Sequence, residues 1–190
     1  MKKLELWFPV RPWVILQGFG ENGWWYRLNV NPDLAGHNGM DINGNFLPVR
    51  AAHDGICVAN YLDKFAGWTV GIKTLEKFEY GGGGAYFKTI YCHFKEQSSI
   101  PLGSRVTVGQ ILGYSDSTGL TTMPHLHFGL KPVLENETDG TLANIEQNNG
   151  FFGAIDPAPY FNNHYAEEGL LYYRLIEKLK KLILLLGGNA

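Results

Sequence analysis

The chain has 190 residues, of which 45% are hydrophobic and 18% charged, and its formal net charge is −2. This composition indicates a globular protein rather than a disordered one. The near-neutral charge gives no electrostatic basis for nucleic-acid binding, so we expect no nucleic-acid partner. The length suffices for one domain with a substantial core and an appendage.

The first eleven residues do not resemble an export signal. Two lysines open the chain, but Glu5, Pro9 and Arg11 interrupt the apolar segment that a signal peptide requires. We therefore expect no secretory signal in this sequence, and the localisation stays open.

Residues 18–23, GFGENG, match the G-x-G-x-x-G pattern of dinucleotide-binding proteins. That pattern requires a helix immediately afterwards. We interpret the following segment, WWYRLNVNPD, as a strand or a loop that ends in a turn, and on this ground we exclude a dinucleotide site.

Turn residues divide the chain between residues 9 and about 161 into short β-branched and aromatic segments, which predict strands. The predicted strands cover residues 13–17, 55–62, 68–75, 85–94 and 105–115. Residues 69–94 predict a long hairpin whose tip, Gly81 to Gly84, is expected to be mobile and to border a binding groove. The fold class is therefore mainly β, with an antiparallel, sandwich-like core.

Both cysteines, Cys57 and Cys92, fall within predicted strands. We expect free, buried thiols, and a disulfide is the alternative if the two strands are neighbours.

Residues 123–130, MPHLHFGL, place two histidines one residue apart in an apolar strand. Because strand side chains alternate between faces, His125 and His127 share one face. His37 and Asp41 form a second local pair, in GHNGMDING, and His93 lies in a further apolar strand. Two histidines and one aspartate would give zinc three protein ligands and leave a fourth position for water. Satisfied strand histidines and a solvated turn are the alternatives for each motif taken alone.

These motifs resemble the lysostaphin/LytM-type zinc metallo-endopeptidases, which cut peptidoglycan peptides. The resemblance covers roughly residues 9–161 and depends on GHNGMDI, YCHF and TGLTTMPHLHF, which occur in the family's order. It implies the lysostaphin/LytM fold, one Zn²⁺ per chain bound by His37, Asp41 and His127, and His93 and His125 as catalytic histidines that do not bind the metal. A zinc-activated water would then hydrolyse a peptide cross-link or bridge, with action at the bacterial cell wall. The order in which His93 and His125 act stays open, as does the bond that is cut.

Three positions depart from the family pattern: Gly129 replaces an acid that often follows HLHF, and Met123 and Asp116 replace glycines. These changes affect the shape of the groove and leave every expected ligand in place. The alternative function is a non-catalytic module of the same fold that binds peptidoglycan or a partner enzyme.

The C-terminal segment predicts an amphipathic helix, because leucines recur at four- and three-residue steps from Leu171 to Leu186. Lysines near its end and Gly187 suit a helix terminus. We expect a peptidase domain at 1–161 and a helical extension at 162–190. This helix would pack on its own domain or mediate self-association, and contact with a membrane surface is the weaker alternative.

Overall fold

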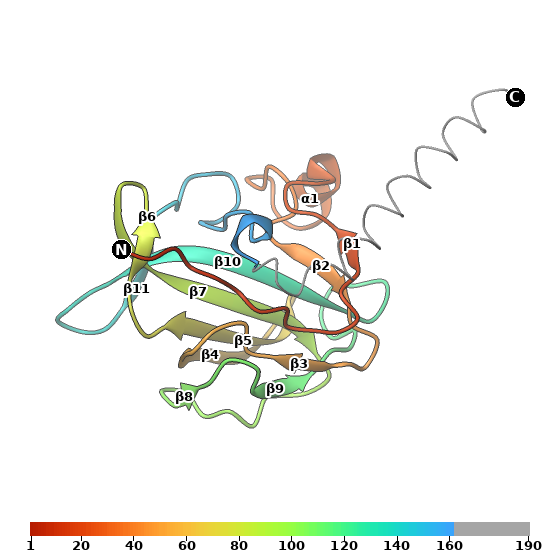
Figure 1. The fold of residues 1–190 in the computed structure, drawn as a ribbon. Coiled ribbons are helices and arrows are strands. Elements are labelled where there is room, and N and C mark those ends of the chain that lie inside the picture. The colour runs from red at the N-terminus through yellow and green to blue at the C-terminus, as the bar shows by residue number, and fades with distance from the viewer. Residues whose placement is uncertain (162–190) are drawn as a thin grey trace, which may run out of the picture.

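Two long neighbouring strands, β7 (Gly83–Phe94) and β10 (His125–Glu135), form the centre of the fold (Figure 1). The computed structural model describes residues 1–161. The helix expected within 162–190 lies outside the described residues.

The remaining elements follow a simple order along the chain. They are β1 (Ile15–Gln17), α1 (Gly23–Asn29), β2 (Met40–Asn43), β3 (Pro48–Arg50), β4 (Gly55–Asp63), β5 (Gly67–Thr74), β6 (Phe78–Tyr80), β8 (Arg105–Val106), β9 (Ile111–Tyr114), β11 (Leu142–Asn144) and the 3-10 turn η1 (Ala158–Tyr160). The large sheet has the order β1-β2-β10-β7-β5-β4-β8, with β6 on β7 and β11 on β10, and β3 pairs with β9 in a small second sheet. Every strand pairing within these two sheets is antiparallel, which confirms the expected fold class.

The central strands have two chemically different faces. Along β10, Leu126, Phe128 and Leu130 are fully buried in the hydrophobic core, whereas the intervening residues, beginning with His125 and His127, point to the other side. On β7, Tyr91 lies on the core side and its ring meets that of Phe128 edge-on at 5.2 Å between centroids. Alternation therefore gives one apolar face and one that is free to carry chemistry.

The N-terminal segment covers the core face. Leu4, Leu6 and Val10 are buried in the core, and Leu6 donates its backbone N–H to the carbonyl of Tyr160 at 2.7 Å. Leu6 also forms a parallel bridge with Phe161. In Figure 1 this segment, in red, runs across the sheet. The two ends of the described chain thus close the same hydrophobic core.

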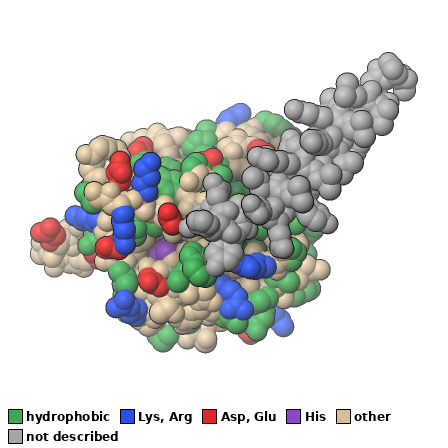
Figure 2. Space-filling model, viewed as in Figure 1, with side chains coloured by type: hydrophobic (Ala, Val, Ile, Leu, Met, Phe, Trp, Pro, Cys, Tyr) green, Lys and Arg blue, Asp and Glu red, His purple; other side chains and the backbone are tan. Residues whose placement is uncertain are grey.

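The view in Figure 2 shows Lys and Arg side chains interspersed with Asp and Glu, and hydrophobic groups between them. Neither sign of charge dominates the surface that is visible there, and only a small patch of histidine reaches it. None of the helices within residues 1–161 is long and apolar enough to cross a membrane.

Most of the predicted strands are present, but the glycine-rich tip is not where we expected it. Gly81 and Gly82 form the β6–β7 turn with positive φ values of 60° and 79°. Gly83 and Gly84 continue into β7, and none of the four glycines lines the groove described below. The expectation that this tip borders a binding groove is wrong.

The expectation for residues 24–33 is also wrong, because α1 is a helix over Gly23–Asn29. Asn22 adopts a left-handed conformation (φ 54°), and its carbonyl accepts the N–H groups of Trp25 and Tyr26 to begin the helix. Aromatic residues favour strands only weakly, so local contacts override that preference. A dinucleotide fold is still excluded, because β1 pairs antiparallel with β2 and no parallel β-α-β unit follows.

The prediction for the cysteines is confirmed: Cys57 and Cys92 are both buried and free.

Candidate metal centre and catalytic groove

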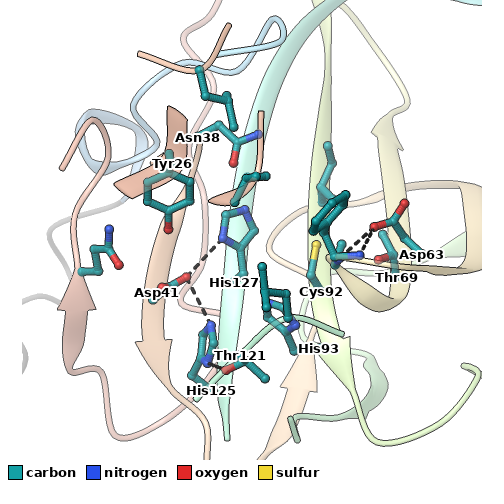
Figure 3. A pocket seen from close by; sticks show the side chains of 18 of the residues that line it. Tyr26, Asn38, Asp41, Asp63, Thr69, Cys92, His93, Thr121, His125 and His127 are labelled. Atoms are coloured by element: carbon teal, nitrogen blue, oxygen red, sulfur yellow. Dashed lines mark hydrogen bonds and ion pairs between the residues drawn. The ribbon is translucent and has the colours of Figure 1, made fainter. Parts of the chain in front are cut away.

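A groove of about 760 Å³ crosses the face of the sheet opposite the core (Figure 3). Its floor comes from β7 and β10, and its walls come from α1 on one side and from the β4–β5 turn and residues 120–122 on the other. The lining residues used below are Trp24, Tyr26, Asn38, Asp41, Asp63, Ile90, Cys92, His93, Thr121, His125, His127, Gly129, Lys131 and Phe152.

Three side chains converge at one end of the groove. Strand pairing of β2 with β10 places Asp41 directly opposite His127, and His37 lies just before β2. His37 Nε2 lies 2.9 Å from His127 Nδ1, and Asp41 Oδ1 lies 3.1 Å from each of these nitrogens. Tetrahedral zinc with bonds of ~2.0–2.1 Å holds its ligand atoms about 3.3 Å apart, so this donor set fits a zinc ion closely.

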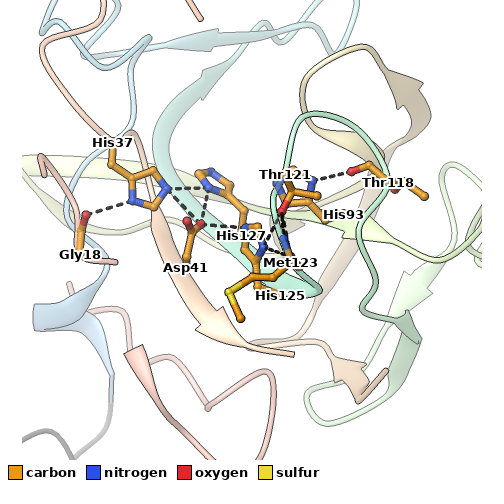
Figure 4. A network of polar contacts seen from close by, with 9 residues as sticks. All are labelled: Gly18, His37, Asp41, His93, Thr118, Thr121, Met123, His125 and His127. Carbon is orange, nitrogen blue, oxygen red and sulfur yellow. Dashed lines mark hydrogen bonds and ion pairs between the residues drawn. The ribbon is translucent and has the colours of Figure 1, made fainter. Parts of the chain in front are cut away.

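The ring of His37 is fixed from two sides (Figure 4). Its Nδ1 donates to the carbonyl of Gly18 at 3.0 Å, because a carbonyl oxygen can only accept. Tyr26 stacks on the ring at 5.3 Å between centroids and 18° between planes. With Nδ1 on Gly18, the ring presents Nε2 to Asp41 and His127, which is the orientation that a metal ligand needs.

Gly39 is required for space rather than for a turn. A Cβ atom there would lie 2.6 Å from His127 Nε2 and 2.7 Å from the carbonyl oxygen of Phe128. Its φ is not in the left-handed region. Glycine thus lets the His37–Asp41 segment approach β10 closely enough for the three side chains to meet.

Electrostatics favour the ligand forms of these groups. Burial would raise the pKa of the Asp41 carboxyl, but hydrogen bonds from His125, His127 and His37 outweigh it and hold that pKa well below its usual range. Burial lowers the pKa of His127. Asp41 is consequently an anion and His127 a neutral imidazole, the forms that bind a cation.

Two further histidines stand beside this group, and backbone carbonyls orient both. His125 Nδ1 lies 2.8 Å from the carbonyl oxygen of Met123 and 3.1 Å from Thr121 Oγ1. His93 Nδ1 donates to the carbonyl of Thr118 at 2.7 Å. Their ring centroids are 4.6 Å apart, and Nε2 is the remaining ring nitrogen of each.

The pKa values of the two rings shift in opposite directions. Burial, aided by the charge of His127, lowers the pKa of His93 to about 4. Burial also acts on His125, but its contact with Asp41 (Nε2 to Oδ1, 3.4 Å) outweighs this and raises its pKa. His93 has a positive φ of 62°, a conformation that a residue with a side chain seldom adopts. Its backbone is held by Ala66 and Asp116.

The structure brings all five expected site residues, His37, Asp41, His93, His125 and His127, to one end of the groove. Sequence reasoning missed Tyr26 and Lys131, and also the carbonyls of Gly18, Thr118 and Met123 that orient the rings. The run of three aromatic residues from Trp24 to Tyr26 could have pointed to Tyr26. Lys131 follows from extending the alternation of His125 and His127 along the strand.

The chain belongs to peptidase family M23, whose family model matches residues 35–144, more than half of the sequence. It is 37% identical over 112 residues to the glycyl-glycine endopeptidase ALE-1 of Staphylococcus capitis, and 33% identical over 112 residues to lysostaphin of Staphylococcus simulans. These alignments cover 54% of this chain but only 26% and 19% of the two relatives. The chain therefore matches about a quarter or less of those longer proteins.

Solved structures show the same fold. The catalytic domain of the antimicrobial peptidase lysostaphin from Staphylococcus simulans matches with a TM-score of 0.56 and 26% identity, over 78% of this chain and 91% of that domain. A zinc-containing peptidase from Vibrio cholerae matches with a TM-score of 0.55 and 21% identity, over 82% of this chain and 41% of that one. The predicted family and the lysostaphin-like fold are confirmed.

Proposed function

We propose that this protein is a zinc-dependent endopeptidase that hydrolyses peptide cross-links or bridges of bacterial peptidoglycan. The observation that carries the proposal is the convergence of three ligand atoms, from His37, Asp41 and His127, beside two further histidines, His93 and His125. A family with this fold and with peptidases among its members supports the same conclusion.

His37, Asp41 and His127 would hold one zinc ion per chain. When bound, zinc would polarise the scissile carbonyl and acidify a water molecule in the groove. Asp41 is ionised, and the proton of His37 is directed to Gly18, so the donor atoms need no rearrangement to receive a cation.

His93 and His125 would move protons and stabilise developing charge. A neutral imidazole can accept a proton at Nε2, and a protonated one can donate a hydrogen bond to an oxyanion or a proton to the leaving amine. Each ring is held at Nδ1 by a backbone carbonyl. A substrate in the groove would meet Nε2 of His93, and Nε2 of His125 lies beside the ligand group, 3.4 Å from Asp41 Oδ1.

The substrate class rests on the relatives and on the shape of the groove. One relative is a glycyl-glycine endopeptidase, and this groove runs along β10 with room for an extended peptide. Peptidoglycan peptides are therefore the proposed partner, and the cell wall is the proposed place of action.

We also propose residues 1–161 as the peptidase domain, because Leu6 and Phe161 close one core. A helical extension at 162–190 that mediates self-association or, less favoured, membrane-surface contact remains a proposal from the sequence.

Mass spectrometry of muropeptides tests the function. Purified cell walls are digested with the zinc-loaded protein, with the protein after chelator treatment and re-addition of zinc, and with Asp41→Asn. We expect new termini that identify one type of peptide bond, loss of these products with chelator, and recovery with zinc. Binding to walls without new termini under any of these conditions would overturn the proposal and favour a non-catalytic binding module.

A further inference from the structure

The groove face of the sheet continues past the metal centre to a pair of lysines. On β10, Gly129 and Lys131 alternate onto the same face as His127. Strand pairing sets Lys131 directly opposite Lys88 of β7, and Lys131 lines the groove. Both side chains are partly buried.

These two lysines have no carboxylate partner among residues 1–161. Lys131 Nζ donates to the carbonyl of Phe152 at 2.6 Å, and Lys88 makes no ion pair there. Lys73, the next lysine across the sheet, provides the contrast, because its Nζ is 2.5 Å from Glu135 Oε1. Like charges placed opposite each other on neighbouring strands are destabilising.

Burial weakens the hold of both side chains on their protons. Burial, and then the charge of Lys88, lower the pKa of Lys131 to about 8, and burial lowers the pKa of Lys88. Lys131 is therefore still mostly charged at pH 7, and neither lysine has a carboxylate partner among residues 1–161.

Glycine at position 129 leaves no side chain between the metal centre and this pair on β10. A Cβ atom on Gly129 would make only ordinary contacts, 3.6 Å from Ile90 Cβ and 3.7 Å from the carbonyl oxygen of Asn38. Packing does not demand glycine at this position, and its effect is to leave the floor clear. Lys131 lies four positions after His127 on β10, about 13 Å along the strand at ~3.3 Å per residue. An extended peptide of about four residues spans this distance.

We propose that Lys131 and Lys88 form an anion-binding subsite. It would bind a carboxylate of the substrate peptide, about three or four residues from the bond that is cut. The inference rests on the proposed function and narrows it to peptides that carry a negative charge at that distance. The carboxylate belongs either to an acidic side chain or to the C-terminus of the peptide.

Peptide binding measures the subsite without requiring catalysis. Capped octapeptides of glycine and alanine, with one glutamate or one glutamine moved along the sequence, are titrated by calorimetry into the zinc-free and the zinc-loaded protein. A second set ends in a free carboxylate instead of an amide and separates the two sources. We expect about tenfold tighter binding of the glutamate peptide over its glutamine counterpart at one position, as for a charge-assisted hydrogen bond.

Four variants locate the effect. Lys131→Met and Lys88→Met should reduce the preference for glutamate to less than about threefold, whereas Lys73→Met, which alters an already paired lysine, should retain it. Gly129→Glu should abolish the preference with both lysines present, because a carboxylate on the same face, two residues from Lys131, can fill the subsite. Thermal unfolding checks each variant, and Lys131→Met should be as stable as the wild type or more so.

The outcomes separate this proposal from the one on which it rests. Equal binding of the glutamate and glutamine peptides at every position would overturn the anion-binding subsite, even if cell walls are cleaved. An unchanged preference for glutamate in both Lys131→Met and Gly129→Glu would overturn it as well. A preference for glutamate peptides without any cleavage of cell walls would overturn the proposed enzymatic function and still support the anion-binding subsite.

Discussion

Two buried polar networks lie on opposite faces of the same strands, and they differ in how their hydrogen bonds are completed. On the core side, His53 Nδ1 donates to the carbonyl of Asp54 at 2.9 Å, and Nε2 accepts from the Thr89 hydroxyl at 2.9 Å. Thr89 lies 3.2 Å from the Tyr91 hydroxyl, which accepts the backbone N–H of Ala52. Each polar atom of this network has a partner within the protein.

On the groove side, three side-chain atoms instead converge on one point. His37 Nε2 and His127 Nδ1 lie 2.9 Å from each other, and each lies 3.1 Å from Asp41 Oδ1. Burial is similar in the two networks, since both His37 and His53 are almost inaccessible. Convergence of three possible ligand atoms, rather than burial, therefore distinguishes the site that could hold a cation.

The strongest test of this difference is Asp41→Asn. The amide keeps the shape of the side chain but removes the negative charge, so we expect zinc content to fall from about one per chain to near zero. The metal would stabilise the transition state of peptide hydrolysis by several kcal/mol. Its loss should therefore lower the cleavage rate at least about a thousandfold. Elemental analysis and cleavage rates measure the two effects. Asp63→Asn, another groove carboxylate, is the control and should retain zinc.

Replacing the histidines that do not belong to the ligand group should separate metal binding from reaction. His93→Ala and His125→Ala should each reduce cleavage about a hundredfold to a thousandfold, as expected for loss of proton transfer, while zinc content stays near one per chain. Full cleavage by either variant would show that its ring takes no part in the reaction. Zinc loss in His125→Ala would instead assign that ring to the metal.

Gly39→Ala tests whether the metal centre depends on close approach. The added methyl group would lie 2.6 Å from His127 Nε2, so the ring must move, and we expect zinc affinity to fall about tenfold to a hundredfold. Gly129→Ala adds the same methyl group on β10 at 3.6 Å from its nearest neighbour and should leave zinc affinity unchanged. Competition with a chelator of known affinity gives both values.

The core network should respond in stability alone. His53→Phe removes the two hydrogen bonds that the ring makes with the Thr89 hydroxyl and the Asp54 carbonyl, and we expect a loss of about 1–3 kcal/mol in the free energy of unfolding. Zinc content and cleavage at low temperature should match the wild type. A loss of zinc in a folded His53→Phe protein would contradict the division between the two networks.

The smallest expected effect is in the pH dependence of stability. Burial lowers the pKa of His53 below its unfolded value of about 6.5, so below this pH the unfolded chain binds a proton that the folded chain does not. Stability is therefore lost as pH falls below about 6.5, by at most about 1.4 kcal/mol per pH unit from this group. Urea titrations of the wild type and His53→Phe between pH 7 and 5 should show a shallower slope in the variant. Parallel slopes would exclude His53 as a source of acid sensitivity.

The sequence predicted the strands well because alternation and turn residues act locally. The segments at 55–62, 68–75 and 85–94 became β4, β5 and β7 almost unchanged. It failed at α1, where aromatic residues favoured a strand but the left-handed Asn22 and the stacking of Tyr26 on His37 stabilise a helix. It also failed for the tip at Gly81 and Gly82, since distance from the groove depends on the whole sheet.

For the site, the motifs were sufficient to select His37, Asp41, His93, His125 and His127, because one-residue spacing on a strand fixes a shared face. They could not show that Asp41 lies opposite His127, which depends on the register between β2 and β10. Nor could they identify the carbonyls of Gly18 and Thr118, since every residue has a backbone carbonyl and residue type does not indicate which of them accepts a hydrogen bond.

The sequence by itself determined the chemistry available: which side chains could bind a metal, which strands carry them and which face they share. Only the tertiary structure decided the geometry, because register and loop packing bring His37 within 2.9 Å of a histidine ninety residues away. The same register sets Lys131 beside Lys88, a pairing that no local pattern predicts. Local periodicity thus fixes the direction of a side chain, and long-range packing fixes what it meets.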